Sequence, residues 1–523
     1  MLAAPGLSIA GILLLLSVLL SVAFFVYGLN TLHLTLRSRR YRLPEMAPLT
    51  SRPPVAIHLP IYNELYVVGR LLKSCVGVAD RYGMGLVRIF VIDDSTDETR
   101  EEIDRLASDY SAQGYKFKVI RRGSRAGFKA GALQTALEQT QETYVAILDA
   151  DFVPPADFLE RTVSVMENDA DVGFVQGRWG HLDRNYNTVT ESVAIGVDAH
   201  FYLEQQGRNG SGYLMNFNGS AGVLRTDAIR KAGGWASDTL AEDLDVSYRI
   251  QLGGYRGVYL NDLEVPAEVP PTIASIKRQQ GRWARGSLQT AKKLLGRIWR
   301  TKNLSTGQKV EAGIHLTYYL VHPLMVASFI LVVVADFLSL DAIRYGVQVG
   351  VPTLSMASGS ASITIETIQV VPWLVFSALI VLSTLSVLMY CVQAVRVQKL
   401  GLFANLRKIA FLVVLGYGMS ISNSVQALNG LLSSETGTFS RTPKYAVVHT
   451  GEDWSKKKYQ IPLNSTTFLE AGAVVLAIFA SGWAVLTGNL GILPILFVYL
   501  TGYAFILYLT IRQKIESGGH RDA

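Results

Sequence analysis

Long runs of apolar residues occupy the start and the last two fifths of the chain, and a region of mixed composition separates them. The first run, 7–29, carries no charged residue and reaches the roughly 20 residues that a membrane-spanning helix needs. Later runs occupy 313–335, 371–392, 409–422, 470–488 and 492–511. The pattern predicts one N-terminal anchor, one domain outside the bilayer and a C-terminal bundle of membrane helices.

We interpret the first run as a retained anchor. It lacks the basic flank, the short apolar core and the A-x-A site of a cleaved signal peptide. The basic stretch RSRRYR (37–42) follows the run. Because basic flanks favour the cytoplasmic side, we expect a multi-pass protein of the cell (inner or plasma) membrane whose large domain lies in the cytoplasm.

The segment 409–428 decides the number of spans. Its second half carries Asn423, Gln426 and Asn429. If it crossed the bilayer, the basic loop 433–466 and the basic C-terminal tail would both lie outside, against the positive-inside rule. We therefore predict five spans, with 409–428 as an interfacial or re-entrant helix and the loop 433–466 in the cytoplasm.

Between anchor and bundle, short apolar runs alternate with helical patterns. Runs within 55–64, 87–99, 117–122 and 143–155 are typical of buried strands, and 130–140 has a helical pattern. This alternation predicts a doubly wound α/β sheet. Ligands of such sheets bind beyond the carboxyl ends of the strands, which is where the acidic residues of this region lie.

The stretch from Lys277 to Lys302 contains nine lysines and arginines and no acid. Leucines, an isoleucine and Trp299 are interleaved with them. This composition predicts an amphipathic helix on the membrane surface; the alternative is a solvated basic helix of the soluble domain. We thus divide the chain into an anchor (1–30), a sheet domain (31–274), interfacial helices (275–311) and a transmembrane bundle of about four spans (312–523).

Composition supports this division. The 523 residues are 49% hydrophobic and only 17% charged, with a mean hydropathy of +0.26. The net charge of +7 suits a domain resting on an anionic membrane, and no nucleic-acid motif accompanies it. Two cysteines, Cys75 and Cys391, cannot form a disulfide framework or a zinc site.

Two clusters, one acidic and one basic, are candidates for chemistry. Asp149 and Asp151 follow the buried run YVAIL; two such carboxylates can hold one divalent cation that binds a diphosphate, although a solvated turn has the same pattern. Arg125 and Lys129 lie beside glycines at a helix start, a natural anion site. Lys129 alone is equally compatible with a surface lysine.

Two further acidic pairs end a strand or begin a helix. Asp93 and Asp94 end the strand in 87–99, where a carboxylate could accept a hydrogen bond from a base. Glu242 and Asp243 begin a helix within 239–250, where the helix dipole favours them. One interpretation is that both residues only stabilise the start of the helix. The other is that Asp243 is a general base that deprotonates an acceptor hydroxyl.

Taken in order, these motifs resemble the processive family 2 glycosyltransferases, with the closest likeness to cellulose synthase and the cellulose synthase-like (type A) mannan and glucan synthases. The resemblance covers about 55–300 and rests on PIYNE (60–64), DDSTD (93–97), KAGAL (129–133), DADF (149–152), FNGSAGVLR (217–225), AEDLDVSYR (241–249) and QQGRW (279–283). It implies a GT-A sheet domain.

The resemblance implies a role for each motif on the donor side. Tyr62 and Glu64, with Asp93 or Asp94, would contact the base and ribose of a nucleotide sugar, and Lys129 would lie near its diphosphate. Asp149 and Asp151 would hold Mg²⁺ or Mn²⁺. Cellulose synthases carry a histidine after the second aspartate; here the residue is Phe152, so this position cannot supply a third ligand.

The resemblance also implies the acceptor side. Asp243, with Glu242 beside it, would be the catalytic base. Gln279, Arg282 and Trp283 would lie at the membrane surface, where Trp283 stacks on the acceptor sugar and Arg282 neutralises the leaving diphosphate. One base and no carboxylate nucleophile implies inversion, from an α-linked donor to a β-linkage.

Two other stretches bear on the same site. GTFSRTPK (437–444) resembles the gating loop of cellulose synthases, through Phe439, Thr442 and Lys444, with Arg441 where that pattern has valine. The tetrapeptide QGRW of the QQGRW motif also occurs at 176–179. We interpret this copy as the tail of a strand whose Arg178 and Trp179 either shape the acceptor side of the pocket or only pack.

We expect an enzyme that polymerises a β-linked hexose from UDP-glucose or GDP-mannose onto a growing polysaccharide and passes the chain through its bundle. The alternative is transfer of a single sugar to a membrane lipid. A transporter or scaffold with an inactive domain is disfavoured by the intact Asp149, Asp151, Asp243 and Trp283. The sequence leaves the sugar and the linkage position open.

Overall fold

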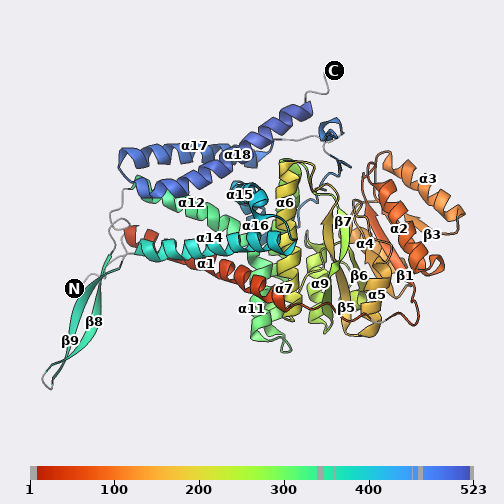
Figure 1. The fold of residues 1–523 in the computed structure, drawn as a ribbon, viewed down its shortest axis with the longest axis horizontal. Helices are drawn as coiled ribbons and strands as arrows, with labels where there is room; N and C mark the ends of the chain where they lie inside the picture. The colour runs from red at the N-terminus through yellow and green to blue at the C-terminus, as the bar shows by residue number, and fades with distance from the viewer. Residues whose placement is uncertain are drawn as a thin grey trace.

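The computed structural model describes residues 9–46, 48–338, 347–357, 360–370, 372–449, 451–457 and 463–518. A sheet covered by helices forms one end of the molecule, and the long helices α1, α12, α14, α17 and α18 extend from it at the other end (Figure 1). The motifs predicted above lie in the part that contains the sheet or where that part joins the long helices.

The sheet has seven strands in the order β3-β2-β1-β4-β6-β5-β7. The strands are β1 (Val55–Ile61), β2 (Val87–Asp93), β3 (Lys116–Ile120), β4 (Tyr144–Ile147), β5 (Val172–His181), β6 (Gly222–Arg225) and β7 (Arg256–Ala267). The first four are parallel to one another, whereas β6 is antiparallel to both of its neighbours, β4 and β5. The α/β fold class is therefore confirmed, with one strand reversed.

Helices cover both faces of the sheet. They are α2 (Val68–Tyr82), α3 (Thr99–Ala112), α4 (Phe128–Gln139), α5 (Phe158–Asn168), α6 (Thr188–Ala199), a π-helix η3 (His200–Gln205), α7 (Gln206–Gly210), α8 (Thr226–Lys231) and α9 (Glu242–Leu252). Side chains alternate along β1, so Val55, Ile57 and Leu59 join the core with α2 and α5, while Ala56 faces α4. Two buried layers thus fix where each strand ends.

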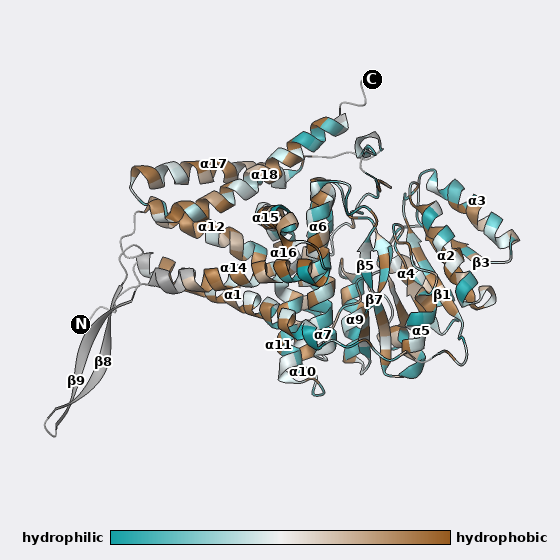
Figure 2. Ribbon diagram, viewed as in Figure 1, coloured by the Kyte–Doolittle hydropathy of each residue, from teal (hydrophilic) through white to brown (hydrophobic). Residues whose placement is uncertain are grey.

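The described residues contain five helices that are long and apolar enough to cross a membrane: Gly11–Arg40, Thr306–Phe337, Ala378–Val397, Ser465–Leu486 and Leu490–Ser517. They correspond to α1 (Ile9–Arg37), α11 (Thr306–Thr317) with α12 (Val321–Phe337), α14 (Pro372–Val397), α17 (Ser465–Leu486) and α18 (Leu493–Gly518). Apolar residues dominate these helices in Figure 2. Large side chains such as Phe479, 68% exposed, suit contact with lipid.

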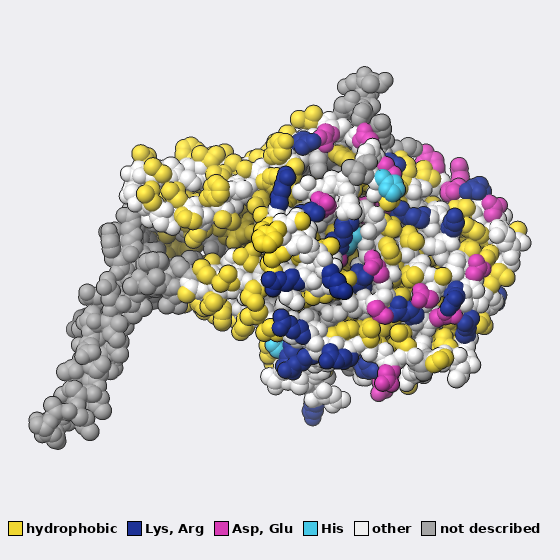
Figure 3. Space-filling model, viewed as in Figure 1, with side chains coloured by type: hydrophobic (Ala, Val, Ile, Leu, Met, Phe, Trp, Pro, Cys, Tyr) yellow, Lys and Arg dark blue, Asp and Glu magenta, His cyan; other side chains and the backbone are white. Residues whose placement is uncertain are grey.

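Hydrophobic side chains cover the surface of this part of the molecule, and Lys and Arg side chains gather where it meets the remainder (Figure 3). This distribution is what a protein needs at a bilayer boundary, because basic side chains favour the headgroup region. The predicted boundary between interfacial and membrane segments, 311/312, falls inside α11, which continues into α12 as one apolar segment.

The segment 402–432 forms two helices, α15 (Leu402–Gly418) and α16 (Ser420–Leu432), with a bend of 50° between them. Both ends of this segment contact other parts of the molecule on the side of the sheet. Near its start, Lys408 pairs with Glu191 of α6 at 3.1 Å. At its end, the carbonyl of Ser433 accepts a hydrogen bond at 3.4 Å from Lys292, which lies in the helix that follows the sheet domain. A pair of helices with this bend is either a broken span or a re-entrant segment, so the predicted re-entrant helix stays a prediction.

A 28-residue helix, α10 (Ile273–Arg300), joins the two parts. Its apolar face, with Ala284, Leu288, Leu294 and Ile298, is buried, and α10 packs on α16, α11 and α9. The predicted amphipathic helix is therefore present. Two strands between α12 and α14, β8 (Val347–Ala357) and β9 (Ser360–Val370), form an antiparallel hairpin on which the sequence analysis made no prediction.

Candidate active site

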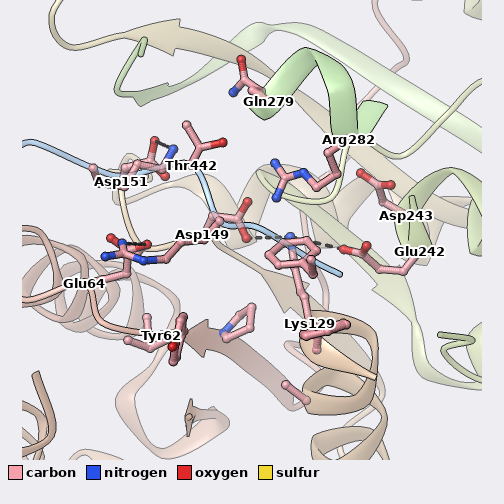
Figure 4. Close-up of a pocket in the computed structure, with 18 of the residues that line it drawn as sticks. Tyr62, Glu64, Lys129, Asp149, Asp151, Glu242, Asp243, Gln279, Arg282 and Thr442 are labelled. Carbon is pink, nitrogen blue, oxygen red and sulfur yellow. Dashed lines mark hydrogen bonds and ion pairs between the residues drawn. The ribbon is translucent and has the colours of Figure 1, made fainter. Parts of the chain in front are cut away.

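A pocket opens beyond the carboxyl ends of β1 and β4, between the sheet and α10 (Figure 4). The residues that line it include nearly all of the predicted site: Tyr62, Glu64, Asp94, Lys129, Asp149, Asp151, Glu242, Asp243, Gln279, Arg282, Trp283, Phe439, Arg441, Thr442 and Lys444. They come from segments nearly 400 residues apart in the sequence, and the fold brings them together.

Asp93 is the exception. It does not line the pocket; its carboxylate pairs with Arg121 at 2.9 Å and accepts a hydrogen bond from the Ser95 amide at 2.9 Å. Consecutive side chains at a strand end point to opposite sides, so Asp94 reaches the pocket and Asp93 does not. Asp94 pairs with Arg122. Of the two alternatives, the structure brings only Asp94 to the pocket.

Lys129 lies in the first turn of α4 and connects the two acidic clusters. Its Nζ is 2.7 Å from Asp149 and 3.6 Å from Glu242, as the dashed lines in Figure 4 show, and it donates to the carbonyl of Gly219 at 3.0 Å. Burial opposes its charge, but Asp149, Glu242 and Asp243 outweigh this effect and raise the pKa of Lys129. A permanent positive charge thus lies between the DxD pair and the predicted base.

Asp149 and Asp151 are suited to a cation. Asp151 is 1% exposed, and its Oδ1 is buried without a hydrogen-bond partner, a costly arrangement unless a ligand completes it. Among the described residues no group of three acids, histidines or cysteines gathers. The two carboxylates fit a divalent cation: Asp149 and Asp151 would hold it, and its other ligands would come from a bound molecule or water.

The gating-like segment (437–444) lies in the pocket against these acids. Lys444 Nζ is 2.6 Å from Asp151 Oδ2, and Arg441 pairs with Glu64 at 3.0 Å. Phe439 lies 4.6 Å from the Arg282 guanidinium and stacks on Phe128. The segment thus places two cationic side chains against two buried acids, Glu64 and Asp151.

Burial dominates the electrostatics of Glu64. It raises the pKa of Glu64 to about 8, although Arg441 and Lys444 act in the opposite direction. Tyr62, the other predicted base contact, lies under Arg125, whose guanidinium carbon is 3.3 Å from the ring centroid. This stack offers a flat cationic surface at the place where the resemblance expects a nucleotide base.

Asp243 lies in the first turn of α9, and the Leu244 amide donates to its Oδ1 at 2.8 Å. Burial and the charge of Glu242 raise the pKa of Asp243, against the influence of Lys129 and Arg282. Gly219, with φ +82°, lies directly against it: a Cβ there would come within 2.5 Å of Asp243 Oδ2. The turn before β6 therefore requires glycine for two reasons, its backbone conformation and the room for Asp243.

The helix α10 carries Gln279, Arg282 and Trp283 on the side that faces the pocket. Further along, Gln289 accepts a hydrogen bond from the Leu240 amide at 2.9 Å and donates to the Thr436 carbonyl at 2.9 Å. One helix thus holds the loop before Asp243 and the start of the gating-like segment. A Cβ on Gly286 would come within 2.6 Å of Ala241, so the helix lies close against that loop.

Two further residues of the pocket are Trp179, whose role the sequence left undecided, and Asn218, to which it assigned no role. Trp179, from the first QGRW copy, lines the pocket and packs against Phe152 and Phe201, so it both packs and shapes the wall. Asn218 lines the pocket as well, and Gln176 Oε1 accepts its amide hydrogen at 2.8 Å. The repeated tetrapeptide and the motif FNGS were the signals that could have found them.

Known proteins resemble this chain in sequence and in fold. The family model described as "Glycosyl transferase family group 2" matches residues 144–395. The chain is 33% identical over 314 residues to glucomannan 4-β-mannosyltransferase 7 of Arabidopsis thaliana, covering 57% of this chain and 56% of that protein. It is 36% identical over 263 residues to a probable glucomannan 4-β-mannosyltransferase 7 of Oryza sativa subsp. japonica, covering 49% and 44%. The chain spans about half the length of these curated relatives.

Among solved structures, a mannosyltransferase from Pyrobaculum calidifontis in complex with GDP-Man and Mn²⁺ superposes with a TM-score of 0.52 and 19% identity, covering 81% of this chain and 100% of that one. At this identity the likeness concerns the fold. The fold is that of GT-A glycosyltransferases, and it is joined to helices that are long and apolar enough to cross a membrane; the family model matches just under half of the chain. The predicted resemblance to the family 2, cellulose synthase-like glycosyltransferases is confirmed, and these findings support a hexosyltransferase.

Proposed function

We propose that this protein is an inverting, metal-dependent β-mannosyltransferase that extends a β-linked mannan or glucomannan from GDP-mannose. The observation that carries the proposal is one pocket that joins a DxD pair, a buried aspartate and the Gln279, Arg282 and Trp283 face of α10. The names of the relatives and the GDP-Man complex of the fold neighbour favour mannose over glucose.

The donor binds on the side of Tyr62, Glu64 and Asp94. In our proposal the base lies on the stack of Arg125 and Tyr62, and Asp149 and Asp151 hold Mg²⁺ or Mn²⁺ against the diphosphate. The bound ion neutralises charge that develops on the leaving diphosphate. Lys129 and Arg282 contribute positive charge of their own, fixed in place before the reaction begins.

The acceptor binds on the side of Trp283 and Trp179, where its terminal sugar stacks on an indole ring. An acceptor hydroxyl attacks C1 of mannose as the bond from C1 to the diphosphate oxygen breaks. Asp243 accepts the hydroxyl proton, and the diphosphate leaves with the bonding electron pair as GDP. A single displacement inverts C1 and gives a β-linkage.

We further propose that the sheet domain, residues 31–274, lies in the cytoplasm, that 275–311 lies at the membrane surface, and that 312–523 conducts the product across the membrane. The contact of α10, which lines the pocket, with α16 supports this route. Lys444, which pairs with Asp151 at 2.6 Å, would give up this pair when Asp149 and Asp151 hold the cation.

The test supplies the purified full chain with labelled GDP-mannose or UDP-glucose and Mn²⁺, and then sizes the product and digests it with an endo-β-mannanase. We expect a mannanase-sensitive polymer from GDP-mannose and little product from UDP-glucose. A product that is only a monoglycosylated, lipid-extractable species would contradict polymerisation and favour the lipid acceptor. A polymer made from UDP-glucose alone would contradict the proposed sugar.

A further inference from the structure

Asn218 lies in the turn before β6, one residue from the glycine that contacts Asp243. It lines the pocket, and its backbone amide is held by Gln176 Oε1 at 2.8 Å. An amide side chain is therefore fixed at the wall of the pocket, beside the proposed base.

Two side chains, the buried Gln205 and the half-buried His200, fix the direction of that amide. Gln205 Nε2 donates to Asn218 Oδ1 at 2.6 Å and to the Asn216 carbonyl at 2.9 Å. Asn218 Nδ2 lies 3.1 Å from His200 Nε2. A carboxamide has two hydrogens and two acceptor sites, so each end of the Asn218 amide keeps one hydrogen-bonding position for a ligand.

The tautomer of His200 follows from its other neighbour. His200 Nδ1 lies 3.0 Å from Glu204 Oε2. Burial raises the pKa of Glu204, but hydrogen bonding from His200 and the charge of Arg208 outweigh burial and hold that pKa well below its usual range. Since an ionised carboxylate only accepts, Nδ1 donates to Glu204; since an amide nitrogen only donates, Nε2 accepts from Asn218 Nδ2.

Glu204 is itself anchored to the membrane helices. Its Oε1 accepts a hydrogen bond from Tyr390 of α14 at 2.8 Å, and Arg208 connects it to Glu311 of α11 at 2.8 Å. His200, Glu204 and Gln205 all belong to the π-helix η3, a local widening that is often found at functional sites. The relay formed by Tyr390, Glu204, His200 and Asn218 thus runs from a membrane helix to the pocket.

We propose that Asn218 is a specificity-determining residue for the acceptor: its carboxamide hydrogen-bonds a hydroxyl of the terminal sugar and so turns the attacking hydroxyl toward Asp243. His200, Gln205, Glu204 and Tyr390 are positioning residues, since Asn218 is the one member of this set that lines the pocket. The inference rests on the proposed function, because it requires a sugar acceptor.

The test measures transfer from saturating GDP-mannose, with Mn²⁺, to soluble β-mannan oligosaccharides of varied concentration. Asn218→Ala should lower kcat/KM for the acceptor roughly 10-fold, the effect of a lost hydrogen bond. The KM for GDP-mannose and the slow hydrolysis of GDP-mannose without acceptor should stay within about twofold, since the donor side is untouched.

Tyr390→Phe tests the relay from its far end. It should lower the same acceptor parameter by about threefold and leave the donor parameters unchanged. Tyr248→Phe is the matched control, because its buried hydroxyl bonds His315 of α11 at 2.7 Å outside the relay, and it should leave both unchanged. Thermal unfolding in detergent verifies that each variant is folded.

The outcomes separate the inference from the function on which it rests. Two outcomes overturn the inference alone, provided that the wild-type protein is active. In the first, Asn218→Ala keeps the wild-type kcat/KM for the acceptor. In the second, Asn218→Ala impairs the KM for GDP-mannose as much as it lowers kcat/KM for the acceptor. Wild-type protein that transfers to no oligosaccharide overturns the proposed function.

Discussion

Asp243 lies in a buried, acidic setting that favours its protonated form, whereas a general base must be deprotonated to work. Its pKa is raised by burial and by Glu242. We therefore predict that kcat/KM falls as the pH falls, with a midpoint well above the ordinary aspartate range, because kcat/KM reports the free enzyme. A pH–rate profile measures this.

Glu242→Gln provides the control for that profile. It removes a negative charge that raises the pKa of Asp243, so the acidic limb should shift to lower pH. A limb that stays in place, or shifts to higher pH, would assign the titration to another group.

Gly219 allows a second test at the residue scale. Gly219→Ala would place a methyl group 2.5 Å from Asp243 Oδ2 on a backbone with φ +82°. We expect a loss of turnover of at least 100-fold with donor affinity nearly kept, since a small displacement of a catalytic group costs about that much. Gly212→Ala is the matched control, with φ +67° and no atom within 4 Å of its added carbon; similar losses in both variants would make the effect one of backbone strain alone.

At this scale the sequence predicted most of the residues that line the pocket, because each motif has its functional side chains within a few residues of one another. Its errors and omissions concern direction and distant partners. Which of Asp93 and Asp94 faces the pocket depends on Arg121 and Arg122, which draw the two carboxylates apart. The setting of Asn218 depends on Gln176 and His200, 42 and 18 residues away, and no local pattern shows such contacts.

At the scale of elements, α10 connects the pocket to the membrane helices. Near its start, Lys277 pairs with Glu470 of α17 at 2.7 Å, with side chains 9% and 0% exposed, and Gln513 of α18 accepts from the Ile273 amide at 2.9 Å. The helix that carries Gln279, Arg282 and Trp283 is therefore fixed to the last two membrane helices.

Glu470→Gln leaves the Lys277 charge buried without its carboxylate. We expect it to destabilise the protein by about 3 kcal/mol and to lower its unfolding temperature and activity together. Lys277→Met with Glu470→Leu should recover much of the lost stability. Glu516→Gln, which breaks the exposed pair with Arg512, is the control and should change little. Equal effects of both single changes would contradict a specific role for the buried pair.

Element types followed from periodicity wherever a helix or strand buries one face. The buried strand predicted from the apolar run of β1 and the basic, amphipathic helix α10 are both present in the structure. The reversed direction of β6 could not be foreseen, since four residues of strand carry no sign of orientation and only pairing with β4 and β5 decides it.

At the scale of the whole molecule, both ends of the bent pair α15–α16 and the gating-like segment lie on the side of the sheet domain. The turn between α17 and α18, with Leu490 58% exposed, lies at the far end of the bundle (Figure 1). Since the two native cysteines are buried, single introduced cysteines can report the topology.

We predict that Leu490→Cys reacts with an impermeant maleimide on intact cells, whereas Ser434→Cys, in the loop after α16, reacts only after permeabilisation. Labelling of Ser434→Cys on intact cells would make α15–α16 a sixth span and contradict the proposed placement of the loop. Wild-type protein should remain unlabelled in both conditions.

The central claim is that Asp243 is the base of a pocket whose donor side is separate and complete. Asp243→Asn tests it directly, through calorimetric binding of GDP-mannose in the presence of Mn²⁺ together with sugar transfer by the same preparation. We expect donor affinity within about threefold of wild type and transfer lowered by at least 1,000-fold, as for the loss of a general base. Transfer at more than a tenth of the wild-type rate, with donor binding intact, would contradict the account.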